Sequence, residues 1–405
     1  MQTKIASLLF SAWAAAAALA AAPTNSATDL GAARCLQKAG PAVVILASVD
    51  RRYERVTGLA TGFLIREDGV LVTDRHVSEA NDALVAFTAD GKEHRVTGFY
   101  GEDWDYDVAV VKIEGSGYAH LSMTVAQLPQ TNQWAAVVTP ETNAQLLCVT
   151  GAVQTVISLP NVFEMLFLTL PVHPGQSGSP LLNESGEVIG VVAGIATNGG
   201  SYATPVNVVQ RILEQTGATT PVPFAKRPRK GNSMPVVLDE TIRAAALAFA
   251  WKDWAAAELL AKQAAKKFPG SPLTLTFLGL TYTQRGHWKE ADAAFAKVVR
   301  LKPDSAFAWL MYGTSSMMRS RFAKADQALR RSITLRLAEK DQLTHAWKMI
   351  AAADAARKDV KGAREALGNL QHLDPGRAEE WRRELQRDYP KLALSDNVGA
   401  KQPGS

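Results

Sequence analysis

Three polar residues, His76, Asp107 and Ser177, constrain the fold of this chain more than any other feature of its sequence. Each stands in a recognisable local sequence: Ser177 lies in the glycine-containing segment 174–180, and Asp107 opens the apolar segment 107–111. A serine hydroxyl is a poor nucleophile at neutral pH. It becomes reactive when an imidazole takes its proton and a carboxylate orients that imidazole. The three residues together therefore predict a site with a nucleophilic serine.

The order His, Asp, Ser along the chain narrows the fold further. It is the order of chymotrypsin, whereas subtilisin and the α/β-hydrolases use other orders. The segment around Ser177 also lacks the Gly-x-Ser-x-Gly elbow of the hydrolases, because Ser179 stands at its last position. Taken singly, Ser177 could be a loop residue, His76 a core histidine and Asp107 a strand cap. Their conjunction predicts a serine protease of the chymotrypsin order with a second domain appended.

Glycines on both sides of Ser177 let the backbone turn tightly. The N–H groups of Gly175 and Ser177 can then converge on one point, where they would stabilise the oxyanion of a tetrahedral intermediate. We therefore expect these two residues to form the oxyanion hole.

Short β-rich segments separated by turn signals fill the first half of the chain, after one short helix expected at 29–38. Many short strands at regular spacing predict an all-β barrel or sandwich. A closing helix is expected over 208–215, with Thr204 as its cap, Pro205 in its first turn and Gly217 at its end. The expected strands are 42–48, 61–65, 70–73, 83–88, 108–113, 135–139, 165–170 and 188–194.

These segments resemble the HtrA/Deg family of trypsin-like proteases. The resemblance rests on residues 61–65, 69–77, 107–110, 174–180 and 186–191. It implies a double six-stranded β-barrel with His76 as general base, Asp107 as its orienting carboxylate and Ser177 as nucleophile.

The chain also departs from the family pattern. Gln176 and Arg75 stand where Asn is usual, and Ser179 replaces a glycine. No PDZ-like domain follows, so PDZ-driven assembly is not expected. The stretch 165–173 holds no Asp or Glu, and the expected pocket wall, Val192, Ala193 and Gly194, is small or aliphatic. An apolar substrate pocket is therefore expected, and such pockets discriminate weakly.

The second half of the chain repeats with a period of 34 residues. Trp254, Trp288 and Phe322 recur at this interval, each followed three residues later by Ala, and a weaker copy begins at Val360 after 38 residues. This pattern resembles the tetratricopeptide repeat (TPR), an all-α solenoid, with an irregular helical bundle as the alternative.

The ends and the linker have compositions of their own. Residues 1–22 read as a signal peptide, with a single membrane anchor as the alternative. The resulting domains are a signal peptide (1–22), a trypsin-like protease domain (28–217), a Pro-rich basic linker (218–237), a TPR domain (238–385) and a disordered tail (386–405).

Composition limits the partners. A net charge of +5 over 405 residues, without a basic stripe among aromatics, argues against nucleic acid as a partner. No histidine shows metal-ligand spacing, so no metal and no other cofactor is expected. The only cysteines, Cys35 and Cys148, could form a disulfide in an oxidising compartment or remain two separate thiols.

Two functions are compatible with these features. The first is an exported serine endopeptidase, periplasmic or secreted, that cleaves extended or unfolded protein segments while TPR repeats recruit substrate or a protein partner. The alternative is a catalytically inert or partner-gated protease-like domain in a TPR scaffold. No stable membrane insertion is expected once the signal peptide is removed.

Overall fold

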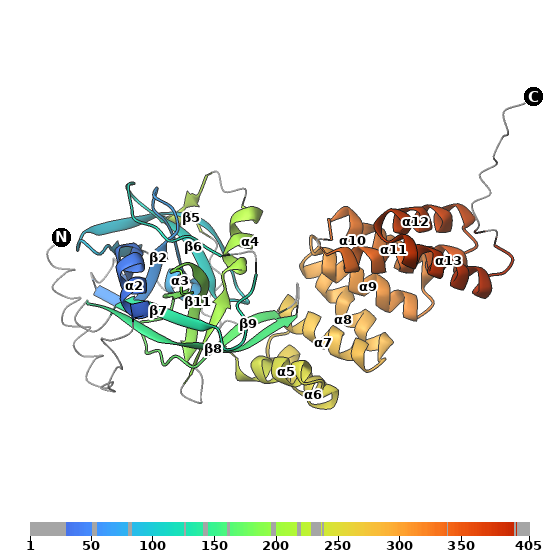
Figure 1. Cartoon of the computed structure of the whole chain (residues 1–405), viewed down its shortest axis with the longest axis horizontal. Coiled ribbons are helices and arrows are strands. Elements are labelled where there is room, and N and C mark those ends of the chain that lie inside the picture. The colour runs from blue at the N-terminus through green and yellow to red at the C-terminus, as the bar shows by residue number, and fades with distance from the viewer. Residues whose placement is uncertain are drawn as a thin grey trace, which may run out of the picture. The chain divides into compact units, whose positions relative to one another are not determined.

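The computed structural model describes residues 30–50, 55–79, 83–124, 127–140, 145–159, 163–195, 200–216, 220–227, 236, 239–337, 339–392 and 394. The expected signal peptide lies outside these residues. The chain divides into two compact units, Met1–Arg243 and Ala244–Ser405. The first is built mainly of strands and the second of helices (Figure 1), as the sequence predicts.

The first unit begins with α2 (Leu30–Ala39) and contains two antiparallel β-barrels. In the first barrel the strands follow the order β5-β4-β1-β2-β3-β6, and pairing of β6 with β5 closes it. Bulges in β5 bend that strand sharply, as closure requires. The strands are β1 (Val43–Asp50), β2 (Arg55–Leu64), β3 (Val70–Asp74), β4 (Ala83–Phe87), β5 (Glu93–Asp103) and β6 (Val108–Ile113).

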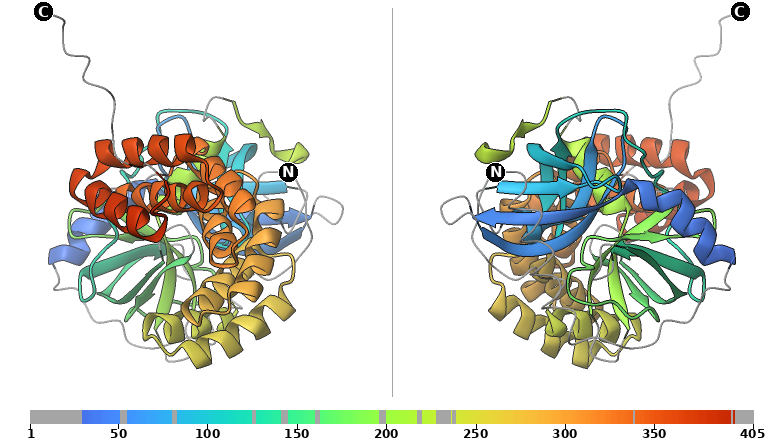
Figure 2. Two further views of the ribbon diagram at one scale, coloured as in Figure 1. Left: turned by 90° about the vertical axis from the view of Figure 1, so that its right-hand side faces the viewer. Right: turned by 90° about the vertical axis from the view of Figure 1, so that its left-hand side faces the viewer.

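The second barrel is closed in the order β10-β11-β12-β9-β8-β7. Its core consists of aliphatic side chains, among them Val137, Leu166, Leu181 and Ile189, that point inward from alternate strand positions. The two barrels appear as separate curved sheets, blue and green, in the right-hand view of Figure 2. The strands are β7 (Trp134–Pro140), β8 (Leu146–Leu159), β9 (Phe163–Leu168), β10 (Pro180–Leu182), β11 (Val188–Ile195) and β12 (Ser201–Pro205).

The predicted double barrel of six strands each is therefore confirmed, but one local expectation is wrong. Helix α4 (Asn207–Gln215) begins after Val206, which supplies no side-chain cap. Thr204 and Pro205 instead belong to β12, and the Thr204 hydroxyl donates a hydrogen bond to the Tyr106 carbonyl at 2.9 Å. A tertiary contact thus takes the hydroxyl that the local sequence offered as a cap. Gly217 lies outside the described residues.

Part of the expected linker packs on the first barrel. Strand β13 (Val222–Pro223) pairs with β5, and the short 3-10 turn η2 (Phe224–Lys226) follows it. Phe224 is buried, and the Arg227 guanidinium lies 3.8 Å from the centre of its ring. Residues 222–227 are therefore part of the folded unit and not exposed chain.

The second unit is a series of paired helices in which each helix packs against the next (Figure 1). Helices α7 and α9 begin 34 residues apart, at Pro272 and Ala306, and so do α6, α8 and α10. The helices are α5 (Glu240–Ala250), α6 (Trp254–Lys267), α7 (Pro272–Gln284), α8 (Trp288–Leu301), α9 (Ala306–Met318), α10 (Phe322–Thr334), α11 (Lys340–Ala356), α12 (Val360–Leu373) and α13 (Pro375–Asp388).

The longer step to Val360 has a simple cause. Helix α11 has 17 residues where α9 has 13, so α12 begins four residues late. The predicted disorder from residue 386 is wrong at its start, because α13 runs to Asp388 and Leu394 is buried among the last helices. Residues 395–405 lie outside the described part.

A charged contact recurs with the same period. Asp292 of α8 binds Arg319 at 2.7 Å, and Glu258 of α6, 34 residues earlier, binds Arg285 at 2.9 Å. Asp326 of α10 binds Arg357 at 3.1 Å, with the four extra residues of α11 included in the spacing. Each repeat thus ties the second helix of one pair to the end of the next helix.

Two further expectations concern thiols and membranes. Cys35 and Cys148 are both free thiols, so the disulfide is not formed in this structure. Within the described ranges, every helix is either too short or too polar to cross a membrane.

Candidate active site

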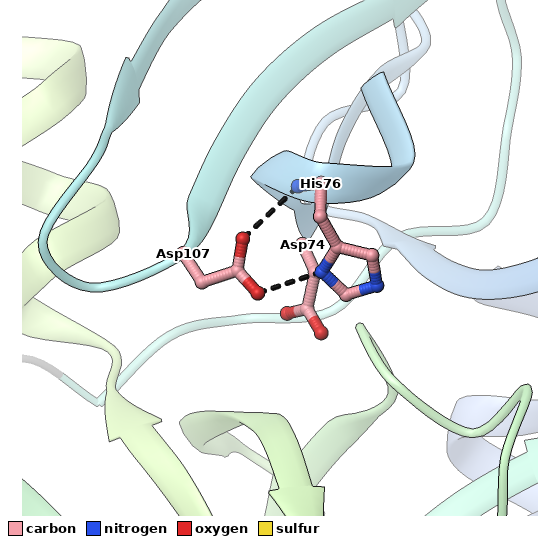
Figure 3. A group of neighbouring side chains, drawn as sticks. All are labelled: Asp74, His76 and Asp107. Atoms are coloured by element: carbon pink, nitrogen blue, oxygen red, sulfur yellow. Dashed lines mark hydrogen bonds and ion pairs between the residues drawn. The ribbon is translucent and has the colours of Figure 1, made fainter. Parts of the chain in front are cut away.

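His76 and Asp107 meet because β3 pairs with β6. His76 lies on the short helix α3 (Arg75–Glu79) directly after β3, and Asp107 directly precedes β6. The pairing sets Asp74 opposite Val108, which brings the two side chains together. Asp107 Oδ2 lies 2.7 Å from His76 Nδ1, and Oδ1 accepts the His76 backbone N–H at 3.0 Å (Figure 3).

Asp107 is held on several sides. Its backbone has φ +56°, a left-handed conformation that Asp tolerates better than most residues. The Arg75 N–H donates to the Asp107 carbonyl at 2.9 Å, and Arg75 Nε lies 3.8 Å from Oδ1. Arg75 is fully buried, with its guanidinium 3.9 Å from the centre of a Trp104 ring. The Arg that departs from the family pattern therefore braces the carboxylate.

Ser177 comes from the second barrel, in the loop between β9 and β10. Thr61 of β2 fastens this loop to the first barrel: its N–H donates to the Ser177 carbonyl at 3.0 Å and its hydroxyl to the Gly175 carbonyl at 2.9 Å. Gly178 has φ +84°, and a Cβ there would lie 2.2 Å from the Thr61 carbonyl oxygen. Only glycine fits this close approach.

The two expected oxyanion donors lie on a tight turn. Gly175 has φ +93°, and neither its N–H nor that of Ser177 donates a hydrogen bond within the described residues. The intervening Gln176 N–H donates to the His173 carbonyl at 3.0 Å, while the Gln176 side chain accepts the His173 N–H at 2.8 Å. Gln176, the other departure from the pattern, thus closes the turn and leaves the donors on either side unused.

Asp74 is a carboxyl that sequence reasoning missed. It is fully buried, and one oxygen of Asp74 lies within 4.8 Å of a ring nitrogen of His76 and of an oxygen of Asp107 (Figure 3). Burial raises the pKa of this carboxyl well above its usual range, and the charge of Asp107 raises it further. The only sequence signal was its position, a charged residue at the end of an apolar strand two residues before His76.

The nucleophile faces this carboxyl. The Ser177 hydroxyl and the Gly178 N–H are directed at Asp74 and favour its ionised form, as does His76. Even so, neither Asp74 oxygen has a partner at full hydrogen-bonding distance. Within the described chain, Ser177 makes no hydrogen bond to His76.

His76 is a stronger base than an isolated imidazole. Burial lowers its pKa, but the hydrogen bond and charge of Asp107, together with the charge of Asp74, outweigh burial and raise the pKa to about 9. At neutral pH the ring is therefore mostly protonated, whereas a general base must be neutral.

The expected pocket wall lies on β11. Val192 and Ala193 are buried, and the Val192 carbonyl accepts the Gly178 N–H at 2.8 Å, so this strand abuts the Ser177 loop. Gly194 lies opposite Tyr202, and a Cβ at Gly194 would lie 2.7 Å from the Tyr202 hydroxyl. Tyr202, which the sequence did not single out, limits the space beside Gly194.

Comparisons with known proteins agree with this fold and arrangement. Residues 60–191 match the sequence family described as "Trypsin-like peptidase domain". Proteins named "Probable periplasmic serine endoprotease DegP-like" are similar to the first unit. The one from Halomonas elongata is 30% identical over 170 residues, which is 40% of this chain and 36% of that protein. The one from Pseudomonas fluorescens is 31% identical over 172 residues, again 40% of this chain and 36% of that protein.

The chain thus spans little more than a third of the length of these relatives. The match covers both barrels and all three residues of the predicted triad, and it does not extend to the helical unit. The first unit therefore contains a trypsin-like protease domain of the HtrA/DegP type.

Proposed function

We propose that this chain is an exported serine endopeptidase that cleaves extended or unfolded protein segments. The observation that carries the proposal is the contact of His76 with Asp107 beside a Ser177 loop that two hydrogen bonds from Thr61 fasten in place. The similarity of the first unit to serine endoproteases supports the same chemistry.

The reaction has two halves. In the first, His76 Nε2 takes the proton of Ser177 as the serine oxygen bonds to the substrate carbonyl carbon. The imidazolium, stabilised by Asp107, then protonates the leaving amine, and an acyl-enzyme remains. In the second half, water bonds to the acyl carbon, its proton goes to His76 and then to Ser177, and the acid product leaves. The N–H groups of Gly175 and Ser177 stabilise the oxyanion in both halves.

Substrates bind as an added strand beside the catalytic cleft, so affinity depends little on sequence. Because Tyr202 limits the space beside Gly194, the side chain before the cleaved bond is small and apolar. Val192 and Ala193 contribute backbone rather than side-chain contacts, since their side chains are buried.

The rest of the chain serves delivery and recruitment. Residues 1–22 direct export to the periplasm and are removed, in line with the periplasmic names of the relatives. The paired helices act as TPR repeats that recruit substrate or a protein partner. Their 34-residue period supports this assignment, and small residues support it where helices cross: a Cβ at Gly279 would lie 2.8 Å from the Phe295 ring.

Fluorophosphonate labelling tests the catalytic claim. The probe bonds to an activated serine, so we expect labelling of the full chain and none of Ser177→Ala. Equal labelling of both would assign the reaction to another residue. Denatured and native forms of one protein, offered as substrates, test the preference for unfolded chains: we expect the denatured form to be cleaved faster by at least tenfold.

A second candidate is a protease-like domain held inactive until a partner binds the helices. One observation favours it: the Ser177 hydroxyl faces Asp74 and is not bonded to His76 in the described residues. A partner-gated enzyme would gain labelling when denatured protein is added at neutral pH. An inert domain would remain unlabelled with or without that addition, at every pH.

A further inference from the structure

Asp74 has no role in the reaction described above, yet its side chain lies inside the catalytic group. It is fully buried on β3, and both its oxygens lack a full hydrogen bond. A buried carboxyl in this condition is costly for a protein, since unsatisfied polar groups lose their hydration. In Figure 3 its carboxyl lies below the His76 ring, beside Asp107.

The charges around Asp74 decide its state. Asp107 and Arg75 are opposite charges that balance one another, with Nε and Oδ1 3.8 Å apart. His76 is the remaining ionisable neighbour on the first barrel. From the second barrel, Asp74 faces the neutral Ser177 hydroxyl and the Gly178 N–H, and Tyr202 lies within electrostatic range. Burial raises the pKa of the Tyr202 phenol, so that residue is neutral as well.

With Arg75 and Asp107 balanced, the buried group is electrically neutral when Asp74 and His76 hold one proton between them. A second proton makes the group positive, and loss of the last makes it negative. Burial disfavours both charged states. Two forms carry the single proton: a carboxylate beside an imidazolium, and a carboxylic acid beside a neutral imidazole.

We propose that Asp74 is a positioning residue that shares this proton with His76 and thereby restrains the Ser177–His76 pair at neutral pH. In the form with a carboxylate and an imidazolium, His76 cannot take a proton, and Asp74 accepts the hydroxyl of Ser177 in its place. The base becomes available when the pair loses its last proton at alkaline pH. This inference rests on the proposed function.

The sign of the effect follows from the charges. The carboxylate of Asp74 raises the pKa of His76, so replacing it by a neutral group lowers that pKa. An opposite charge within about 4–6 Å changes a pKa by about 1–3 units. Asp74→Asn keeps the shape and removes the charge. Well below the midpoint, each unit of decrease raises the neutral fraction of His76 by about tenfold.

The experiment measures the rate of fluorophosphonate labelling of the full chain from pH 5 to 10. We expect the wild-type rate to rise toward a midpoint near pH 9, in keeping with the pKa of His76. For Asp74→Asn we expect a midpoint about one unit lower or more, and labelling about tenfold faster at pH 7. Asp68→Asn, which removes a carboxyl in the turn before β3, is the matched control and leaves the midpoint unchanged.

A direct titration separates this inference from the proposed function. Histidine ring signals in nuclear magnetic resonance report the pKa of His76 whether or not Ser177 reacts. A decrease in Asp74→Asn supports the inference even if no chain is labelled, a result that would overturn only the proposed function. Labelled wild type with the same midpoint and the same His76 pKa in Asp74→Asn would overturn the inference alone. If Asp74→Asn fails to fold, Asp74→Ser, smaller and also neutral, answers the same question.

Discussion

The two units of this chain obtain order in different ways. In the helical unit the same contact recurs at nearly constant sequence separation: Asp292 with Arg319, and Glu258 with Arg285. In the protease unit each contact at the site occurs once and joins distant segments, such as Thr61 with Gly175, 114 residues apart. Repeats spread stability over similar local contacts, whereas the barrels concentrate function on a few unique ones. Single substitutions should therefore abolish the site but only weaken the helices.

The largest effect is expected from Asp107→Asn. The amide can take the left-handed backbone of this position, but it donates to His76 Nδ1 and stabilises the wrong tautomer. We expect labelling of Ser177 to slow by about 10³–10⁴-fold, the cost of losing an orienting carboxylate. The measurement is the labelling rate at pH 9, where wild-type His76 is substantially neutral.

The control for Asp107→Asn is hydrogen exchange in the helical unit, which should match wild type. A rate within tenfold of wild type would show that Asp107 does not orient the base. It would also remove the sharp difference between the two units on which the comparison depends.

A pair of glycines compares close packing in the two units. A Cβ at Gly178 would lie 2.2 Å from a backbone oxygen, at φ +84°, whereas a Cβ at Gly279 would lie 2.8 Å from the Phe295 ring. We expect Gly178→Ala to lower the free energy of unfolding of the first unit by about 3 kcal/mol or more and to abolish labelling. Gly279→Ala should cost about 1 kcal/mol, because the ring shifts and alanine favours the helix.

Urea denaturation gives these free energies, and hydrogen exchange assigns each loss to its unit. Gly368→Ala on α12 is the control, since nothing lies within 4 Å of the added Cβ. Equal losses at Gly178 and Gly279 would contradict the view that the barrel contact cannot adjust.

The same difference explains which features the sequence revealed. The first residues of α6, α8 and α10 were predicted because their signals, Trp254, Trp288 and Phe322, lie within one repeat. The double barrel was predicted because strand segments are also local patterns. The role of Thr204 and the packing of residues 222–227 on β5 escaped prediction, since both depend on partners about 100 residues or more away.

At the candidate site the division is equally clear. His76, Asp107 and Ser177 stand in segments that a sequence can identify. Asp74 does not, because its importance comes from burial and from missing partners, and neither property is written in the residues beside it. The brace of Arg75 against Trp104 also needed the fold, since the sequence marked Arg75 only as a departure from a pattern.

The smallest effect is expected in the helices, from Asp292→Asn. This carboxylate is buried and binds Ser316 at 2.6 Å, Arg319 at 2.7 Å and Arg321 at 3.0 Å. Because both arginines are partly exposed to water, they remain hydrated when the charge is removed, and we expect a loss of about 1–2 kcal/mol. Urea denaturation in low and high salt measures it, and salt should narrow the difference from wild type. Glu258→Gln, at the same place one repeat earlier, should lose a similar amount, with labelling of Ser177 unchanged in both. If either substitution unfolded the whole helical unit, the repeats would be as dependent on single contacts as the protease site is.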